Sequence, residues 1–274
     1  MKGRNLLLGL LLGVLAAFWL FSFWIFFQPP ADAPSAFLRR GRRPSTKKLV
    51  LCFGDSLTHA RLSGDYIALL RDRFSARGYE FINAGINGHT TYDLLKRLDQ
   101  VIACQPDYVT ILIGTNDIFA TEGNRAKMQY RLPYVPTLEQ YRENYEHILS
   151  RLQAETSARI AILSLPPLGE DLDSAMNQRV MQYCAAIHDI AITHGVTYLP
   201  LHEELLALLD GHVARSTFTG AMMPILSAGT QRYLLGTSWN DIAAGQGLRL
   251  LTDYIHLNDR GAAVIAQLVA EFLD

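Results

Sequence analysis

The chain has 274 residues, of which 49% are hydrophobic, and it carries a net charge of −1. This hydrophobic content excludes a disordered protein, and the length suits one α/β domain with a sizeable core. The charge is uneven, because the first 48 residues hold eight of the 25 basic side chains and only one of the 26 acidic ones. The remainder is therefore acidic and lacks the basic surface that nucleic-acid binding needs.

The N-terminal part of the chain predicts a membrane anchor. Residues 6–27 form an uncharged run of 22 residues, which as a helix would be roughly 33 Å long, about the thickness of a bilayer core. A signal peptide has a shorter apolar core of about 7–15 residues, although Ala31-Asp32-Ala33 resembles a cleavage site and keeps that alternative open. We therefore expect residues 1–27 to form a single-pass anchor. Because long domains translocate largely regardless of charge, we expect the rest to lie outside the cytoplasm.

Residues 28–47 are rich in proline, alanine and arginine and are interpreted as a linker. Its basic side chains would either contact anionic lipid headgroups or be solvated.

From residue 48 to residue 274, strand-like and helix-like stretches alternate. This alternation is typical of a parallel sheet with helices on both faces. The predicted strands are Leu49–Phe53, Tyr79–Asn83, Tyr108–Ile113, Arg159–Leu165 and Val196–Leu201. The predicted helices are Tyr66–Arg77, Tyr92–Cys104, Leu138–Glu155, Ser174–Gly195 and Arg260–Leu273.

Two long segments, residues 118–137 and 205–252, interrupt this alternation. Long connections inside a compact domain are usually functional or disordered, and the apolar content of residues 205–252 argues against disorder. This insertion is either a lid or acyl-binding wall, or an extra helical pair that only packs.

No metal or cofactor is expected. The three cysteines, Cys52, Cys104 and Cys184, show neither metal-ligand spacing nor a disulfide pattern. Glu170, Asp171 and Asp173 form an acidic cluster without accompanying histidines, which is interpreted as a solvated loop.

The stretch Gly54-Asp55-Ser56 follows the first predicted strand, at the sheet edge where open α/β proteins place their sites. Ser56 at this position can be a nucleophile if a base and oxyanion donors accompany it, and a plain turn or helix N-cap is the alternative.

The other parts of such a site occur later in the chain. Asp253 precedes His256 by three residues, a spacing that can orient the imidazole toward a serine. The backbone N–H of Gly85 and the side-chain amide of Asn116 each follow a predicted strand and could stabilise an oxyanion. Each feature alone also suits an ordinary turn, but together and in this order they indicate a site.

With these four segments, the chain from about residue 49 to residue 274 resembles the SGNH hydrolases, also called GDSL-type lipases and esterases. Gly54-Asp55-Ser56-Leu57 matches the serine block, Gly85 the glycine block, Gly114-Thr115-Asn116-Asp117 the asparagine block, and Asp253-Tyr254-Ile255-His256 the block with aspartate and histidine. The resemblance implies a flavodoxin-like three-layer α/β/α sandwich with a five-stranded parallel sheet.

The resemblance also implies ester hydrolysis through an acyl-serine intermediate, without a metal or cofactor. Ser56 would be the nucleophile, His256 the base and Asp253 its partner, while Ser56, Gly85 and Asn116 would supply the oxyanion hole. The expected substrate is a lipid-like or thioester acyl chain, as for a lysophospholipase or thioesterase. The alternatives are an acetyl group on a cell-envelope glycan, or a catalytically dead binding module anchored to the membrane.

Overall fold

The computed structural model describes residues 2–123, 128–214 and 222–274. Its centre is a five-stranded sheet in the order β2-β1-β3-β4-β5. All pairings in the sheet are parallel, so the predicted α/β fold with a five-stranded parallel sheet is confirmed. The strands are β1 (Lys48–Gly54), β2 (Tyr79–Gly85), β3 (Tyr108–Leu112), β4 (Arg159–Leu163) and β5 (Thr197–Leu199). This order is the flavodoxin-like one, whose ligands bind beyond the carboxyl ends of the strands.

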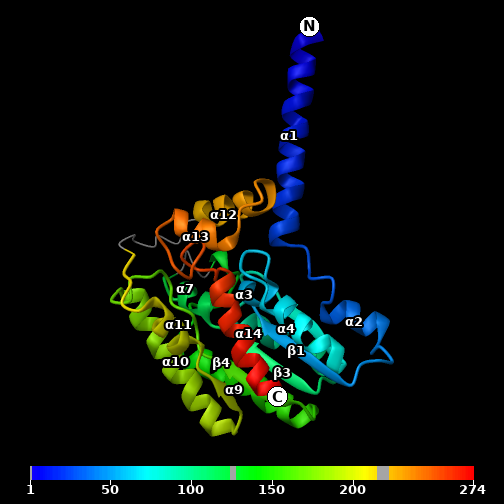
Figure 1. Cartoon of the computed structure of the whole chain (residues 1–274), viewed down its shortest axis with the longest axis vertical. Helices are drawn as coiled ribbons and strands as arrows, with labels where there is room; N and C mark the ends of the chain where they lie inside the picture. The colour runs from blue at the N-terminus through cyan, green and yellow to red at the C-terminus, as the bar shows by residue number, and fades with distance from the viewer. Residues whose placement is uncertain (1, 124–127, 215–221) are drawn as a thin grey trace.

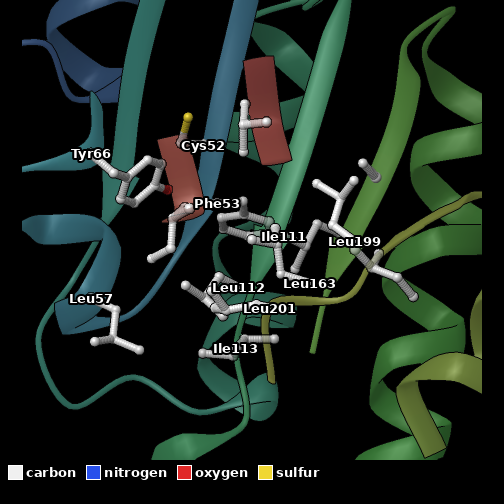
Figure 2. Close-up of a cluster of buried hydrophobic side chains, with 14 of the residues drawn as sticks. Cys52, Phe53, Leu57, Tyr66, Ile111, Leu112, Ile113, Leu163, Leu199 and Leu201 are labelled. Atoms are coloured by element: carbon white, nitrogen blue, oxygen red, sulfur yellow. The ribbon is translucent and has the colours of Figure 1, made fainter. Parts of the chain in front are cut away.

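Both faces of the sheet are covered. Successive side chains of a strand point to opposite faces, and every residue of β1 after Lys48 is buried. Figure 2 shows part of the resulting core, in which Phe53 of β1, Ile111 of β3 and Leu163 of β4 come from neighbouring strands. Continuous burial of this kind explains why the strands are apolar runs rather than alternating patterns.

The helices form a layer on each side of the sheet (Figure 1). In one layer α14 (Asp259–Leu273) packs against α4 (Tyr66–Phe74) and α11 (Leu201–Leu209). In the other, α9 (Leu138–Glu155) packs against α5 (Thr91–Lys96), α6 (Leu98–Ala103) and α10 (Ala175–His194). The predicted helix over Leu138–Glu155 is confirmed with the same bounds.

One helix prediction is wrong in detail. The stretch Tyr92–Cys104 was expected to form one helix, but α5 ends at Lys96 and α6 begins at Leu98. The break lies at Arg97, whose φ of −116° and ψ of 11° are not helical. Apolar periodicity continues through the break, because buried Leu94, Leu98 and Val101 still face the core.

The two long segments contain additional helices. The first, residues 118–137, begins within α7 (Thr115–Ala120), and its residues 124–127 are outside the described residues. The insertion includes the end of α11, then α12 (Met222–Leu234) and α13 (Trp239–Gly245), while residues 215–221 are not described. Helices α12 and α13 contact each other through buried Ala228, Trp239 and Ile242.

The expected linker is partly folded onto the domain. Residues 34–40 form α2 (Pro34–Arg40), and Phe37 is buried. The basic side chains pair with acids of the domain, since Arg40 contacts Glu80 and Arg42 lies 2.6 Å from Asp107. These two arginines are therefore paired with acids of the domain, although each side chain remains 39% exposed.

The apolar N-terminal segment forms α1 (Lys2–Phe26), which projects away from the domain (Figure 1). Within the described part of the chain, no helix combines the length and the apolar character that a membrane span needs. The expected transmembrane helix over residues 6–27 is therefore not supported by the structure.

Candidate active site

Ser56 is the first residue of the short helix α3 (Ser56–His59), directly after β1. Asp55 begins this helix as its N-cap, with its carboxylate accepting a hydrogen bond from the Leu57 N–H at 3.0 Å. Because the first N–H groups of a helix have no intrahelical partner, the Ser56 N–H is available to a ligand. The serine thus stands at the carboxyl edge of the sheet, as the sequence predicted.

A continuous hydrogen-bonded chain links Ser56 to a histidine and an aspartate. The Ser56 Oγ lies 2.9 Å from His256 Nε2, and His256 Nδ1 lies 2.8 Å from Asp253 Oδ2. Nδ1–H donates to the carboxylate, so Nε2 is left to accept a hydrogen bond from the Ser56 hydroxyl. The other carboxylate oxygen of Asp253 accepts from the His256 N–H at 2.9 Å, which fixes the loop around the pair. All three residues are at most 7% exposed.

The buried carboxylate of Glu170 supports this loop. Glu170 was interpreted as part of a solvated acidic loop, but it is 1% exposed. Its carboxylate accepts hydrogen bonds from the backbone N–H groups of Arg249, Leu250 and Leu251, at 2.7–3.0 Å. These three peptide groups come directly before the segment that carries Asp253 and His256.

Gly85, one predicted oxyanion donor, is already engaged. Its N–H donates to Asn83 Oδ1 at 2.9 Å, within the same strand end. A Cβ at Gly85 would lie 2.2 Å from the backbone nitrogen of His59. Glycine is therefore needed here because α3 packs directly against β2.

Gly88, three residues later, is a donor candidate that the sequence analysis missed. It has φ of +76°, and among the described residues its N–H has no hydrogen-bond partner. The signal in the sequence was the second glycine of Gly85-Ile86-Asn87-Gly88, which follows the strand by a short turn.

Asn116, the other predicted donor, lies near the start of α7. Its amide nitrogen is 2.9 Å from the His89 carbonyl oxygen and 3.2 Å from Asp55 Oδ2. The amide is thereby held between the β1 edge and the loop after β2, beside the segment that contains Gly88.

Two buried carboxylic acids flank the site. Burial raises the pKa of Asp55 to about 6, although the Leu57 N–H and His256 lower it in part. Burial raises the pKa of Asp117 to about 7, opposed by hydrogen bonds from the Thr91 hydroxyl and N–H. The site is thus poor in solvent, so hydrogen bonds within it are strong.

The end of α1 packs against the loops around the site. The side-chain amide of Asn87 donates to the carbonyl oxygens of Ile25 and Phe26, at 3.1 and 3.0 Å. Arg61 donates to the carbonyl oxygen of Gln28 at 2.8 Å. The two bonds from Asn87 satisfy carbonyl groups that the end of α1 leaves without intrahelical partners.

The sequence matches the model of the GDSL-like lipase/acylhydrolase family over residues 52–264. This chain belongs to that family. With a GDSL-type serine, it is a serine ester hydrolase.

Among curated proteins, the chain is similar to an acetylxylan esterase of Geobacillus stearothermophilus. The two are 32% identical over 163 residues, which cover 52% of this chain and 70% of the relative.

Solved structures share the fold at lower identity. A catalytic mutant of the acetylxylan esterase Axe2 from the same organism superposes with a TM-score of 0.61 at 18% identity, covering 82% of this chain and 94% of the other. The acetyl xylan esterase AlAXEase gives a TM-score of 0.59 at 22% identity, and the match covers 82% of this chain and 100% of AlAXEase. LAE5, an α/β hydrolase from the metagenome of Lake Arreo in Spain, gives a TM-score of 0.58 at 20% identity. This match covers 82% of this chain and 94% of LAE5.

Proposed function

We propose that Ser56, His256 and Asp253 are the catalytic residues of this ester hydrolase. The observation that carries the proposal is the buried hydrogen-bonded chain from the Ser56 hydroxyl through the imidazole to the Asp253 carboxylate. A serine hydroxyl is a weak nucleophile at neutral pH, and an adjacent base that accepts its proton activates it. The intact chain also argues against a catalytically dead binding module.

The reaction then has two halves. The Ser56 Oγ attacks the acyl carbon while its proton moves to His256 Nε2, and the Asp253 carboxylate stabilises the imidazolium. The tetrahedral intermediate collapses as Nε2 returns the proton to the leaving alcohol oxygen, which leaves an acyl-serine. Water then attacks the acyl carbon while His256 Nε2 takes its proton. As this second tetrahedral intermediate collapses, the bond from the acyl carbon to Ser56 Oγ breaks, Nε2 returns the proton to Oγ, and the carboxylic acid leaves.

The proposed oxyanion hole consists of the Ser56 N–H, the Asn116 amide and the N–H of Gly88. Gly88 replaces Gly85, because the Gly85 N–H is bonded to Asn83. The Asn116 amide contacts Asp55 at 3.2 Å, longer than its 2.9 Å bond to His89, and this longer contact yields to the oxyanion.

The proposed substrate is an acetyl ester on a carbohydrate. The support is the 32% identity to an acetylxylan esterase, which covers 70% of that relative. The lipid-like substrate is a second candidate, favoured by exposed apolar side chains at the start of α12, where Met222 and Met223 are 53% and 70% exposed.

Ester hydrolysis tests both the nucleophile and the substrate. The wild type should release acetate from acetylated xylo-oligosaccharides, and its activity on p-nitrophenyl esters should fall steeply from acetate to octanoate. Ser56→Ala should be inactive on all of them. Preference for octanoate would instead support the lipid candidate, and turnover by Ser56→Ala would refute the proposed nucleophile.

We also propose that α1 tethers the enzyme to a membrane, with the domain outside the cytoplasm. The proposal rests on the uncharged run of residues 6–27 and on exposed apolar side chains of this segment, namely Leu10, Leu12, Leu15, Phe18, Trp19, Leu20, Phe23 and Phe27. Alkaline carbonate extraction should leave the full chain in the membrane pellet, and an impermeant fluorophosphonate should label it in intact cells. Recovery in the soluble fraction would refute the tether.

A further inference from the structure

Arg97 interrupts a helix that the apolar pattern would continue. It lies between α5 and α6 with non-helical backbone angles. Its guanidinium turns back toward the carboxyl edge of the sheet and lies over the Phe53 ring, 4.7 Å from the ring centroid. The backbone break therefore accompanies a specific placement of this one side chain.

The guanidinium binds two strand ends at once. Nη1 donates to the carbonyl oxygen of Ala84 and Nη2 to that of Gly54, each at 2.7 Å. Nε lies 3.1 Å from Nδ1 of His89, which accepts its hydrogen. Among the described residues Arg97 forms no ion pair, so backbone carbonyls rather than a carboxylate are its main partners. Bonds of this length from a charged donor are strong, and they fix orientation as well as distance.

Two of these partners lie close in sequence to a proposed oxyanion donor. The Gly54 carbonyl ends β1, two residues before the Ser56 N–H. His89 directly follows Gly88, and its own carbonyl oxygen holds the Asn116 amide at 2.9 Å.

The third partner is the Ala84 carbonyl, and the bond from Arg97 fixes the end of β2. The Ala84 carbonyl belongs to the same peptide group as the Gly85 N–H, and Asn83 binds that N–H from the other side. This peptide group is thus held at both ends, and the loop that leads to Gly88 starts from a fixed position.

We infer that Arg97 is a positioning residue that sets the geometry of the oxyanion hole through its bonds to the ends of β1 and β2. The inference rests on the proposed function, because it assumes that the hole stabilises an acyl-transfer transition state. Arg97 touches no reacting atom. It acts by holding the peptide groups of Gly54 and Ala84 and the side chain of His89 in register.

The planar fork is essential to this role. A guanidinium can donate to two carbonyl groups in fixed directions, whereas a lysine ammonium is a single point charge on a flexible stem. Arg97→Lys keeps the charge and loses the simultaneous bridge, while Arg97→Met loses both. The two variants therefore separate charge from geometry.

The test compares kcat, KM and stability in the full-length enzyme. Arg97→Met should lower kcat by about 10²-fold, the usual effect of a misplacement of about 1 Å. Arg97→Lys should lower kcat by about tenfold, and KM should change by less than about threefold in both. The rate of Ser56 labelling by a fluorophosphonate, whose oxygen occupies the oxyanion hole, should fall in parallel with kcat.

Leu98→Ala is the matched control, because Leu98 is fully buried in the adjacent position and bonds to nothing in the site. It should lower the urea midpoint of unfolding, because it leaves a cavity in the core, yet keep kcat within about twofold at a temperature where it is folded.

Three outcomes would overturn the inference. They are wild-type kcat in Arg97→Met or in Arg97→Lys, a loss confined to KM, or failure of both Arg97 variants to fold while Leu98→Ala folds. The last would make Arg97 a residue of the fold alone. Ser56→Ala, measured alongside, separates the two levels. If it remains active the proposed function fails, whereas if it is inactive and Arg97→Met is fully active only the role of Arg97 fails.

Discussion

Glu170 supplies a sharp test of how the loop that carries Asp253 and His256 is held. Its fully buried carboxylate accepts four contacts from the N–H groups of Arg249, Leu250 and Leu251. Asp253 follows Leu251 by two residues, so any movement of these peptide groups is passed to the triad. We predict that Glu170→Ala loses both stability and turnover.

The size of the loss follows from the three N–H groups. Each buried donor left without a partner costs about 1–3 kcal/mol, so Glu170→Ala should lower the free energy of unfolding by at least about 3 kcal/mol. This is a large share of the roughly 5–15 kcal/mol that folded domains possess. Glu170→Gln keeps one carbonyl oxygen, which can still accept from Leu250 and Leu251, and should lose about 1–2 kcal/mol.

Urea unfolding and steady-state kinetics with p-nitrophenyl acetate measure the two effects. In the fraction that remains folded, Glu170→Ala should show kcat lowered by about 10²-fold. Asp173→Ala, in the same acidic loop but exposed, is the control and should change stability by less than about 0.5 kcal/mol. Wild-type stability and kcat in Glu170→Ala would refute the reasoning, since a solvated acid would behave that way.

Three further predictions concern the site itself. Asn116→Ala should keep its fold and lose about 10²–10³-fold in kcat, the usual loss for one oxyanion donor; unchanged kcat would exclude the amide from the hole. Ser56→Ala and His256→Ala should each nearly abolish turnover, and the double variant should be little worse than either, because residues that act as a unit give non-additive losses. If the two losses in turnover multiplied in the double variant, Ser56 and His256 would not be coupled. The folded protein binds the Asp117 proton more tightly than the unfolded chain does, since burial raises this pKa from 3.8 to about 7. The contribution of Asp117 to stability therefore falls as pH rises between these values, by up to about 1.4 kcal/mol per pH unit. Unfolding of Asp117→Asn at pH 5 and pH 7 should show the variant gaining about 2–3 kcal/mol relative to wild type; an equal difference at both pH values would contradict it.

Periodicity and capping predicted most of the sheet and helices because both are local properties of the chain. The bounds of α10 follow from Ser174, whose side chain caps its start, and from Gly195, whose positive φ of 62° ends it. The segments of the triad were likewise predictable, since parallel strands place their carboxyl ends at one edge.

The misreadings share a different cause. Glu170, the Gly85 N–H and the helix break at Arg97 each depend on partners that the sequence alone does not place beside them. The acid of a Gly-Glu-Asp turn is normally exposed, and only the fold brings the N–H groups of residues 249–251 against it. The glycine of a strand end suggests an open donor, and only the packing of α3 and the Asn83 side chain show that its N–H is taken.

The buried Glu170 and the partly buried Arg97 solve the same physical problem at two places. Peptide groups lie buried both at the strand ends of the carboxyl edge and in the loop before Asp253, and buried peptide groups without partners are costly. A carboxylate accepts from N–H groups and a guanidinium donates to carbonyl groups, so Glu170 suits the loop before the triad and Arg97 suits the ends of β1 and β2. Water could satisfy the same groups, but it would leave the loops free to shift. Protein charges satisfy them in fixed directions, and this is the property that a site with a 2.9 Å contact between nucleophile and base requires.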